Sequence, residues 1–238
     1  ISRRLQDVVS RAETGSPAPE CIGFVPGVIN HDQSFAAFLA EPRLLKLCTA
    51  VLGHDVRISF TSVIVNQPGN QRGGWHADWP FNQTNAGHVS APYPDQLMHL
   101  TTLWMISEFT ERNGGTLVVP ASHRLPTNPT AADCDIDAQD SHPDEERVTG
   151  PAGSVLVMDS RLWHATAPNS TETDRVALAV RYAPWWLNTE ILRPGSDTRR
   201  QLVDEPGLSD NQVPSLPRQV YDSLPTDVQP LYRHWIEP

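Results

Sequence analysis

The chain has 238 residues, which is enough for one sizeable domain with its own apolar core. Its net charge of −10 and the lack of any Lys- or Arg-rich block argue against binding to nucleic acid or to an anionic membrane, since both need a basic surface. Three widely spaced cysteines predict neither a disulfide framework nor a zinc cluster. With no signal peptide and no apolar run of membrane-spanning length, they favour a cytoplasmic protein.

The N-terminal part of the chain has helical patterns. Apolar residues at helical spacing predict helices over about residues 1–14, 34–39 and 44–52, and the last of these ends at Gly53. We expect residues 1–55 to form a helical support that packs on the outside of the domain and takes no part in chemistry.

The middle of the chain, from about residue 56 to 183, changes to a strand pattern. β-Branched and apolar runs predict strands over 56–65, 97–109, 116–119, 155–158 and 175–182. The Asn-Gly-Gly turn at 113–115 predicts a hairpin between the strands on its two sides. Short strands in the middle and helices at both ends predict one mainly β domain over residues 1–238, with a two-sheet jelly-roll core.

Two less regular segments surround this core. Residues 126–150 are polar and acidic and contain prolines, which is typical of a solvated excursion. The alternative is a mobile lid over a site, because long loops in compact domains are often functional. The tail is broken by prolines; we expect short helices over 219–224 and 228–235, and a C-terminal wrapper over 184–238.

Two side chains that can ligate a metal stand two residues apart in the stretch 73–79. In an extended strand alternate side chains share a face, so the imidazole of His76 and the carboxylate of Asp78 converge on one point. A third ligand must come from elsewhere, and His164, at the end of another strand-like run, is the best candidate. Two histidines and one carboxylate on one side of a metal, with the other positions open, are the pattern of non-haem Fe(II) oxygenases.

An inward-facing arginine is predicted beside this site. If a hairpin follows His164, then His164 and Arg175 lie opposite each other on neighbouring strands, and Thr166 shares their face. On the strand of Arg175, the small side chains of Ala177 and Ala179 leave room for a ligand. An inward arginine is costly unless an anion meets it, and its planar fork suits a carboxylate.

The chain resembles the phytanoyl-CoA dioxygenase family of Fe(II)/2-oxoglutarate enzymes. Three segments carry the resemblance, in the expected order and within about residues 56–183: WHADW at 75–79, NGGTLVVPASHR at 113–124, and RLWHATAPN at 161–169, followed by Arg175. The resemblance implies a double-stranded β-helix fold, which agrees with the pattern of strands and turns.

The resemblance also implies a ligand set, a cosubstrate and a reaction. The positions that match the iron ligands of the family are His76, Asp78 and His164. The positions that match its 2-oxoglutarate-binding residues are Arg175, Thr166, Trp104 and Thr101. The implied reaction consumes O2 and 2-oxoglutarate, releases succinate and CO2, and hydroxylates an unactivated C–H bond of a small organic molecule. Related halogenases have a small residue in place of the carboxylate ligand, so Asp78 favours hydroxylation.

Substrate contacts are expected from side chains just beyond the ligand strand and the Arg175 strand, and from a strand histidine near the cavity. An apolar pocket with a few polar groups would suit a small organic molecule. The candidates are Trp79, Phe81, Asn82, His99, Arg124, Trp185 and Trp186. Core packing is the alternative for the aromatic residues.

Each assignment has a simpler alternative. An isolated His-x-Asp is most often an ordinary hydrogen-bonded pair, and Arg175 could form a surface salt bridge with Glu172 or Asp174. A non-catalytic jelly-roll binding module could retain the ligand set without activity. A cupin-like enzyme could use another metal without a keto acid, but it would have no need of Arg175 and Thr166 beside that metal.

Overall fold

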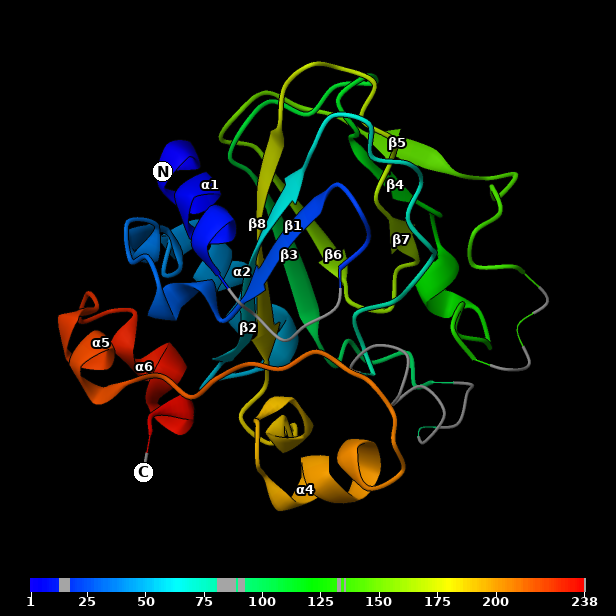
Figure 1. Ribbon diagram of the computed structural model, residues 1–238. Coiled ribbons are helices and arrows are strands. Elements are labelled where there is room, and N and C mark those ends of the chain that lie inside the picture. Colours follow the sequence, from blue (N-terminus) through cyan, green and yellow to red (C-terminus); the bar gives the residue numbers. More distant parts are fainter. Residues whose placement is uncertain (13–17, 81–88, 90–92, 132–133, 135, 238) are drawn as a thin grey trace.

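The centre of the protein consists of two antiparallel β-sheets (Figure 1). The structure is a computed structural model, and it describes residues 1–12, 18–80, 89, 93–131, 134 and 136–237. The larger sheet has the strand order β1-β2-β8-β3-β6, and the smaller sheet has the order β5-β4-β7. The strands are β1 (Ile22–Pro26), β2 (Arg57–Asn66), β3 (Leu100–Met105), β4 (Thr116–Val118), β5 (Glu146–Val148), β6 (Val155–Asp159), β7 (His164–Ala165) and β8 (Arg175–Ala183).

Strand β8 lies in the middle of the larger sheet, and its two faces contact different parts of the protein. It pairs with β2 on one side and with β3 on the other, and all of its residues are buried. Alternate side chains of a strand point to opposite faces. Val176 and Val180 accordingly pack into the main apolar core under the helices, whereas Ala177 and Ala179 lie on the opposite face, as predicted.

Helices cover the outer face of the larger sheet, to the left in Figure 1. The α-helices are α1 (Ser2–Arg11), α2 (Pro42–Leu52), α4 (Asp197–Arg199), α5 (Arg218–Ser223) and α6 (Gln229–Tyr232). Single turns are the 3₁₀ segments η1 (Val28–Asn30), η2 (Ala36–Phe38), η3 (Ser122–Arg124), η4 (Glu190–Leu192) and η6 (Arg233–Trp235), and the π segment η5 (Arg200–Asp204). Apolar side chains of α1, α2, α5 and α6 join the same core as the strands, so both ends of the chain stabilise the sheet.

Helix α2 shows how the local sequence sets its ends. The carboxylate of Glu41 accepts a hydrogen bond from the backbone N–H of Leu44, and Pro42 occupies the first turn, where a missing N–H costs nothing. Gly53 ends the helix with φ of +86°, a conformation that favours glycine. The helix end at Gly53 is therefore confirmed.

The predicted fold class is confirmed: the protein is mainly β with flanking helices and has the double-stranded β-helix arrangement, although the two sheets do not close into a continuous barrel. The N-terminal segment is not purely helical as predicted, because β1 pairs with β2 along the edge of the larger sheet. The short helices predicted in the tail are present as α5, α6 and η6. No helix in the described part of the chain is long and apolar enough to cross a bilayer.

Two predicted hairpins are wrong, and for the same physical reason. The turn at 113–115 connects β3 of the larger sheet to β4 of the smaller one, so these strands do not pair. The turn after His164 likewise connects β7 in the smaller sheet to β8 in the larger one. The side-chain amide of Asn169 donates to the carbonyls of Asn66 and Thr173, which holds this crossing in place. Each turn joins two sheets rather than two paired strands.

Candidate metal centre

The segment 73–79 runs antiparallel beside β7, at the edge of the smaller sheet. The backbones of His76 and His164 exchange both hydrogen bonds of a β-bridge, with N–O distances of 3.1 and 3.0 Å. Further along, the N–H of Asp78 donates to the carbonyl of Ser160 at 2.7 Å. This pairing brings two parts of the chain that are far apart in sequence onto one edge, and it places the two imidazole rings opposite each other with centroids 4.2 Å apart.

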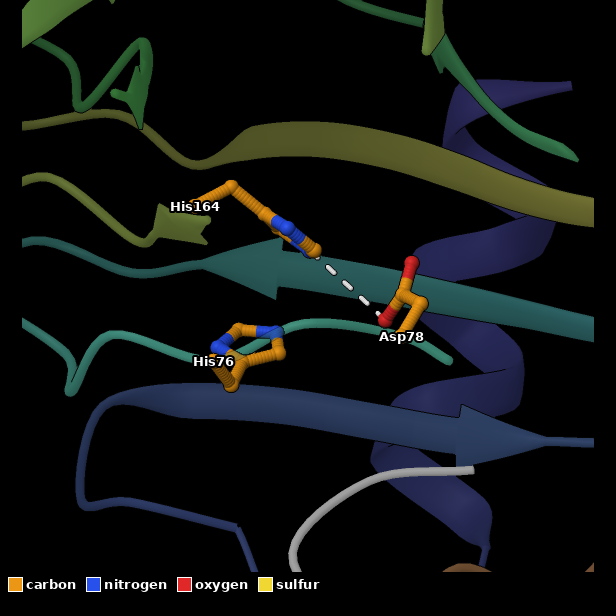
Figure 2. Close-up of side chains that lie close together, drawn as sticks. All are labelled: His76, Asp78 and His164. Carbon is orange, nitrogen blue, oxygen red and sulfur yellow. Dashed lines mark ion pairs between the residues drawn. The ribbon is translucent and has the colours of Figure 1, made fainter. Parts of the chain in front are cut away.

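The side chains of His76, Asp78 and His164 point toward one another (Figure 2). One ligand atom from each of the three lies within 4.8 Å of the others. This spacing is close to what a single ion with bonds of about 2.1 Å requires. Within the described residues, no other group of three or more His, Cys, Asp or Glu side chains converges in this way.

Both histidines are oriented as metal ligands usually are. Nδ1 of His76 lies 3.1 Å from the carbonyl oxygen of Gly74, and Nδ1 of His164 lies 2.9 Å from that of Leu162. A carbonyl can only accept, so Nδ1 carries a proton in each ring and Nε2 is the nitrogen left to bind a metal. A backbone carbonyl on the other ring nitrogen is the common way to orient a ligating imidazole.

The electrostatics of the cluster favour a cation between these groups. Nε2 of His164 lies 3.6 Å from Oδ1 of Asp78, so a nitrogen and an oxygen that can both ligate a cation lie close together. Burial lowers the pKa of His76 to about 4, which keeps its imidazole neutral near pH 7. Burial alone would raise the pKa of Asp78, but the nearby guanidinium of Arg181 outweighs it and holds this pKa below its usual value. The donor set therefore fits a divalent metal: two imidazoles and one carboxylate.

A cavity of about 610 Å³ extends from this cluster between the two sheets. Its walls include all three cluster residues, and also Arg175, Thr166 and Thr101. The guanidinium of Arg175 is 2% exposed; its Nε donates to the carbonyl of Gly114 at 3.1 Å, and it lies 4.5 Å from the ring centroid of Phe109. No carboxylate pairs with Arg175 in the part of the chain that the structure describes. Burial lowers its pKa to about 10, so it stays charged near pH 7.

Comparison with known proteins matches residues 24–177, well over half of the chain, to the family model described as "Phytanoyl-CoA dioxygenase (PhyH)". The chain belongs to the phytanoyl-CoA dioxygenase (PhyH) family. The family resemblance read from the sequence is therefore confirmed.

Two curated relatives of this PhyH chain are dioxygenase af480 from Aspergillus fumigatus and ectoine dioxygenase from Sphingopyxis alaskensis. The first is 27% identical over 70% of this chain and 49% of its own length. The second is 28% identical over 64% of this chain and 55% of its own length. The chain thus spans about half the length of these relatives. Among solved structures, HygX from Streptomyces hygroscopicus, crystallised with nickel, 2-oxoglutarate and hygromycin B, aligns with a TM-score of 0.58 and 18% identity over 79% of this chain and 80% of that one.

Trp104 was assigned to the cosubstrate pocket, and this assignment is wrong. Thr101 and Leu103 line the cavity, so Trp104 points to the opposite face of β3. There its indole N–H donates to the hydroxyl of Thr102 at 3.1 Å, and its ring packs against Phe38 at 6.2 Å between centroids. Alternation along the strand, which is a local rule, excludes a shared face for residues three apart.

The predicted substrate contacts do not line the cavity where the structure describes them. Trp79 is buried in the main core against Tyr93, and His99 is buried behind the cavity wall. The remaining three side chains are exposed outside the cavity: Arg124, Trp185 and Trp186. Phe81 and Asn82 lie outside the described residues. The prediction of these contacts rests on positions along the chain. Such positions do not determine whether a side chain points into the cavity or away from it.

The strongest feature that sequence reasoning missed is Arg181. It continues the inward face of β8 beyond Ala179, and its guanidinium donates to Oδ1 of Asp78 and lies 4.1 Å from the ring centroid of Phe60. The signal was available, because the alternation that turns Arg175 inward also turns Arg181 inward. The centre thus contains two buried guanidinium groups rather than one.

Two parts of the acidic segment 126–150 line the cavity, while many of its other described side chains are exposed. Residues 129–131 and 138–139 contribute to the cavity walls. The segment is tied to the ligand strand at Trp75, whose backbone N–H and indole N–H donate to the carbonyls of Ala138 and Asp140 at 2.7 and 2.8 Å. A bidentate pair between Arg72 and Glu145 adds a second tether. We call the cavity-lining residues of this segment, 129–131 and 138–139, the roof of the site.

Proposed function

We propose that this chain is a non-haem Fe(II)/2-oxoglutarate-dependent oxygenase that hydroxylates an unactivated C–H bond of a small organic molecule, with release of succinate and CO2. One observation carries the proposal: two imidazoles and a carboxylate converge in the same cavity as a buried guanidinium that has no carboxylate partner among the described residues. Membership of the PhyH family supports it.

The cluster residues have separate roles in this proposal. His76, Asp78 and His164 would hold the iron, and three protein ligands would leave coordination positions for a keto acid and for O2. Bound iron and 2-oxoglutarate supply the O2-activating chemistry. Arg175, together with Thr166 in the wall of the same cavity, binds the distal carboxylate of 2-oxoglutarate, because that anion neutralises a buried charge and fits the planar fork.

Glycine residues of the ligand strand make room for this arrangement. A Cβ atom at Gly73 would lie 3.3 Å from Cβ of Thr166, and one at Gly74 would lie 2.7 Å from the side-chain amide nitrogen of Gln139 in the roof. The chain can therefore pass close to both the proposed carboxylate site and the roof. We infer that a side chain at either position would narrow the entrance to the metal centre.

The remaining walls suit a small organic substrate. Apolar side chains from both sheets and from the N-terminal segment line the cavity, together with a few uncharged polar groups. The polar wall residues away from the metal cluster are Ser62, Thr116, Thr130, Gln139 and Asn211. An apolar cavity with a few fixed polar groups is typical of small-molecule sites. Asp78, already paired with Arg181, is the one acidic side chain among the described lining residues, which disfavours a cationic substrate.

Anaerobic addition of Fe(II) and 2-oxoglutarate tests the proposal. We expect a visible charge-transfer band that is absent in Asp78→Ala and weakened in Arg175→Ala. Trp104→Phe is the matched control, because Trp104 faces away from the cavity, and it should keep the band. Absence of the band in the unaltered protein would contradict the proposal. A band accompanied only by slow succinate formation that no candidate substrate accelerates would favour the non-catalytic binding module.

A further inference from the structure

A series of buried polar side chains leads away from Asp78: it begins at Thr101 in the cavity wall and continues through side chains that do not line the cavity. The hydroxyl of Thr101 donates to Oδ2 of Asp78 at 2.8 Å and lies 2.7 Å from the hydroxyl of Ser160. Ser160 lies 2.8 Å from Nδ1 of His99, and Nε2 of His99 lies 2.7 Å from the hydroxyl of Ser59. Each of these side chains is at most 2% exposed, so water does not compete for the bonds.

This series of hydrogen bonds ends at the carboxylate of Asp78, and that end determines which group donates in each bond. An ionised carboxylate only accepts, so Thr101 must give it the single proton of its hydroxyl. Thr101 then accepts from Ser160, and Ser160 in turn accepts from Nδ1–H of His99. His99 is thus a donor toward the metal cluster, and its Nε2 accepts from the hydroxyl of Ser59, whose contact with the carbonyl of Arg181 is longer, at 3.4 Å.

This series of hydrogen bonds gives the two carboxylate oxygens of Asp78 different surroundings. Oδ2 is held by Thr101 on the buried side, whereas Oδ1 is the oxygen nearest His164, at 3.6 Å. The backbone repeats the link: the N–H of Asp78 donates to the carbonyl of Ser160 at 2.7 Å, and the N–H of Ser160 donates to the carbonyl of His99 at 3.1 Å. The orientation of the carboxylate is therefore coupled to residue 99 by two parallel routes.

We propose that His99 is a positioning residue of the metal centre. Acting through Ser160 and Thr101, it fixes the Asp78 carboxylate so that Oδ1 alone faces the metal. A buried histidine that only fills space would need neither a donor at Nδ1 nor the aligned hydroxyl groups. The inference rests on the proposed function, because it concerns the same metal site. Loss of a partner that orients a metal ligand commonly costs about 10–100-fold in metal affinity.

A matched pair of variants separates positioning from packing. Asn and Leu have similar shapes, and both remove the same part of the imidazole, but Asn can place an amide N–H where Nδ1–H donates to Ser160. Co(II) binding, followed by visible absorption without 2-oxoglutarate, is the readout. We expect His99→Leu to weaken Co(II) binding about 10–100-fold and to change the shape of the Co(II) spectrum. His99→Asn should retain most of the affinity and the spectrum, while urea unfolding shows similar losses of metal-free stability in both.

Equal Co(II) affinities and spectra in the Asn and Leu variants would overturn the inference. If His99→Leu does not fold, Ser160→Ala interrupts the chain with little loss of volume. It should weaken Co(II) binding in the same way, and unchanged binding in that variant would also overturn the inference. The Asp78→Ala variant distinguishes a failure of the proposed function from a failure of the role of His99. If the unaltered protein does not bind Co(II), the proposed function fails; if it binds Co(II) through Asp78 but ignores the substitutions at 99 and 160, only the role of His99 fails.

Discussion

The two ends of β8 place the same side chain in two different electrostatic environments. Arg175 and Arg181 lie on the same inward face, and each guanidinium stacks on an aromatic ring, Phe109 or Phe60. Arg181 donates to the carboxylate of Asp78, whereas Arg175 donates only to a backbone carbonyl in the described structure. Both are buried.

The two arginines therefore differ in their counterions: Arg181 has one in the folded protein, whereas Arg175 has none among the described residues. A buried charge that already has a counterion contributes to the folded state, because its removal leaves the charge of its partner buried and uncompensated. A buried charge without a counterion is costly in the empty protein, and that cost is offset when an anion binds. We therefore propose that Arg175 binds an anionic ligand, whereas Arg181 pairs with Asp78 in the folded protein.

The largest expected effect comes from Arg181→Met. Asp78 would lose its cationic partner while still buried, so the free energy of unfolding of the metal-free protein should fall by about 3–5 kcal/mol. Urea unfolding measures this change. Adding Asp78→Asn to the same protein should recover part of the loss, since the stranded charge is gone. Equal stability of Arg181→Met and the unaltered protein would contradict a structural role for this pair.

The opposite pattern is expected at the other end of the strand. Arg175→Met should weaken 2-oxoglutarate binding by about 2–4 kcal/mol, or roughly 30- to 1,000-fold, because a buried carboxylate loses its guanidinium. The stability of the ligand-free protein should stay the same or rise. Titration of 2-oxoglutarate into the Co(II)-loaded protein, with urea unfolding alongside, measures both. A large loss of stability without loss of affinity would reverse the assignment.

A partly buried basic group, His234, sharpens the comparison, because an imidazole can release its proton and a guanidinium cannot. Burial, with Arg57 and Arg193 nearby, lowers the pKa of His234 to about 3. The folded state therefore binds fewer protons than the unfolded state below about pH 6.5, and stability present above that pH is lost as the pH falls toward 3.

Replacement of this imidazole should reduce the sensitivity to acid. The stability lost by the unaltered protein between pH 7 and pH 5 should exceed that lost by His234→Gln by about 1–2 kcal/mol. Urea unfolding at the two pH values measures the difference. His31→Gln, a change at an exposed histidine, is the control and should behave like the unaltered protein. An acid response identical in His234→Gln and the unaltered protein would show that His234 is already protonated in the fold.

The sequence by itself determined the properties that depend on a few neighbouring residues. Alternation placed His76 with Asp78, and Arg175 with Ala177 and Ala179, because the direction of successive side chains is a local property of an extended backbone. The same rule, applied fully, would have turned Trp104 away from the cavity and Arg181 into it. The family motifs added the order of these segments and, through it, the fold.

Only the tertiary structure decided which segments meet. His164 pairs across strands with His76 and not with Arg175, because β7 and β8 belong to different sheets. The link from His99 to Asp78 likewise depends on Ser160, which comes from beyond the end of another strand. Strand pairing reflects the packing free energy of the whole domain, which no short stretch of residues contains.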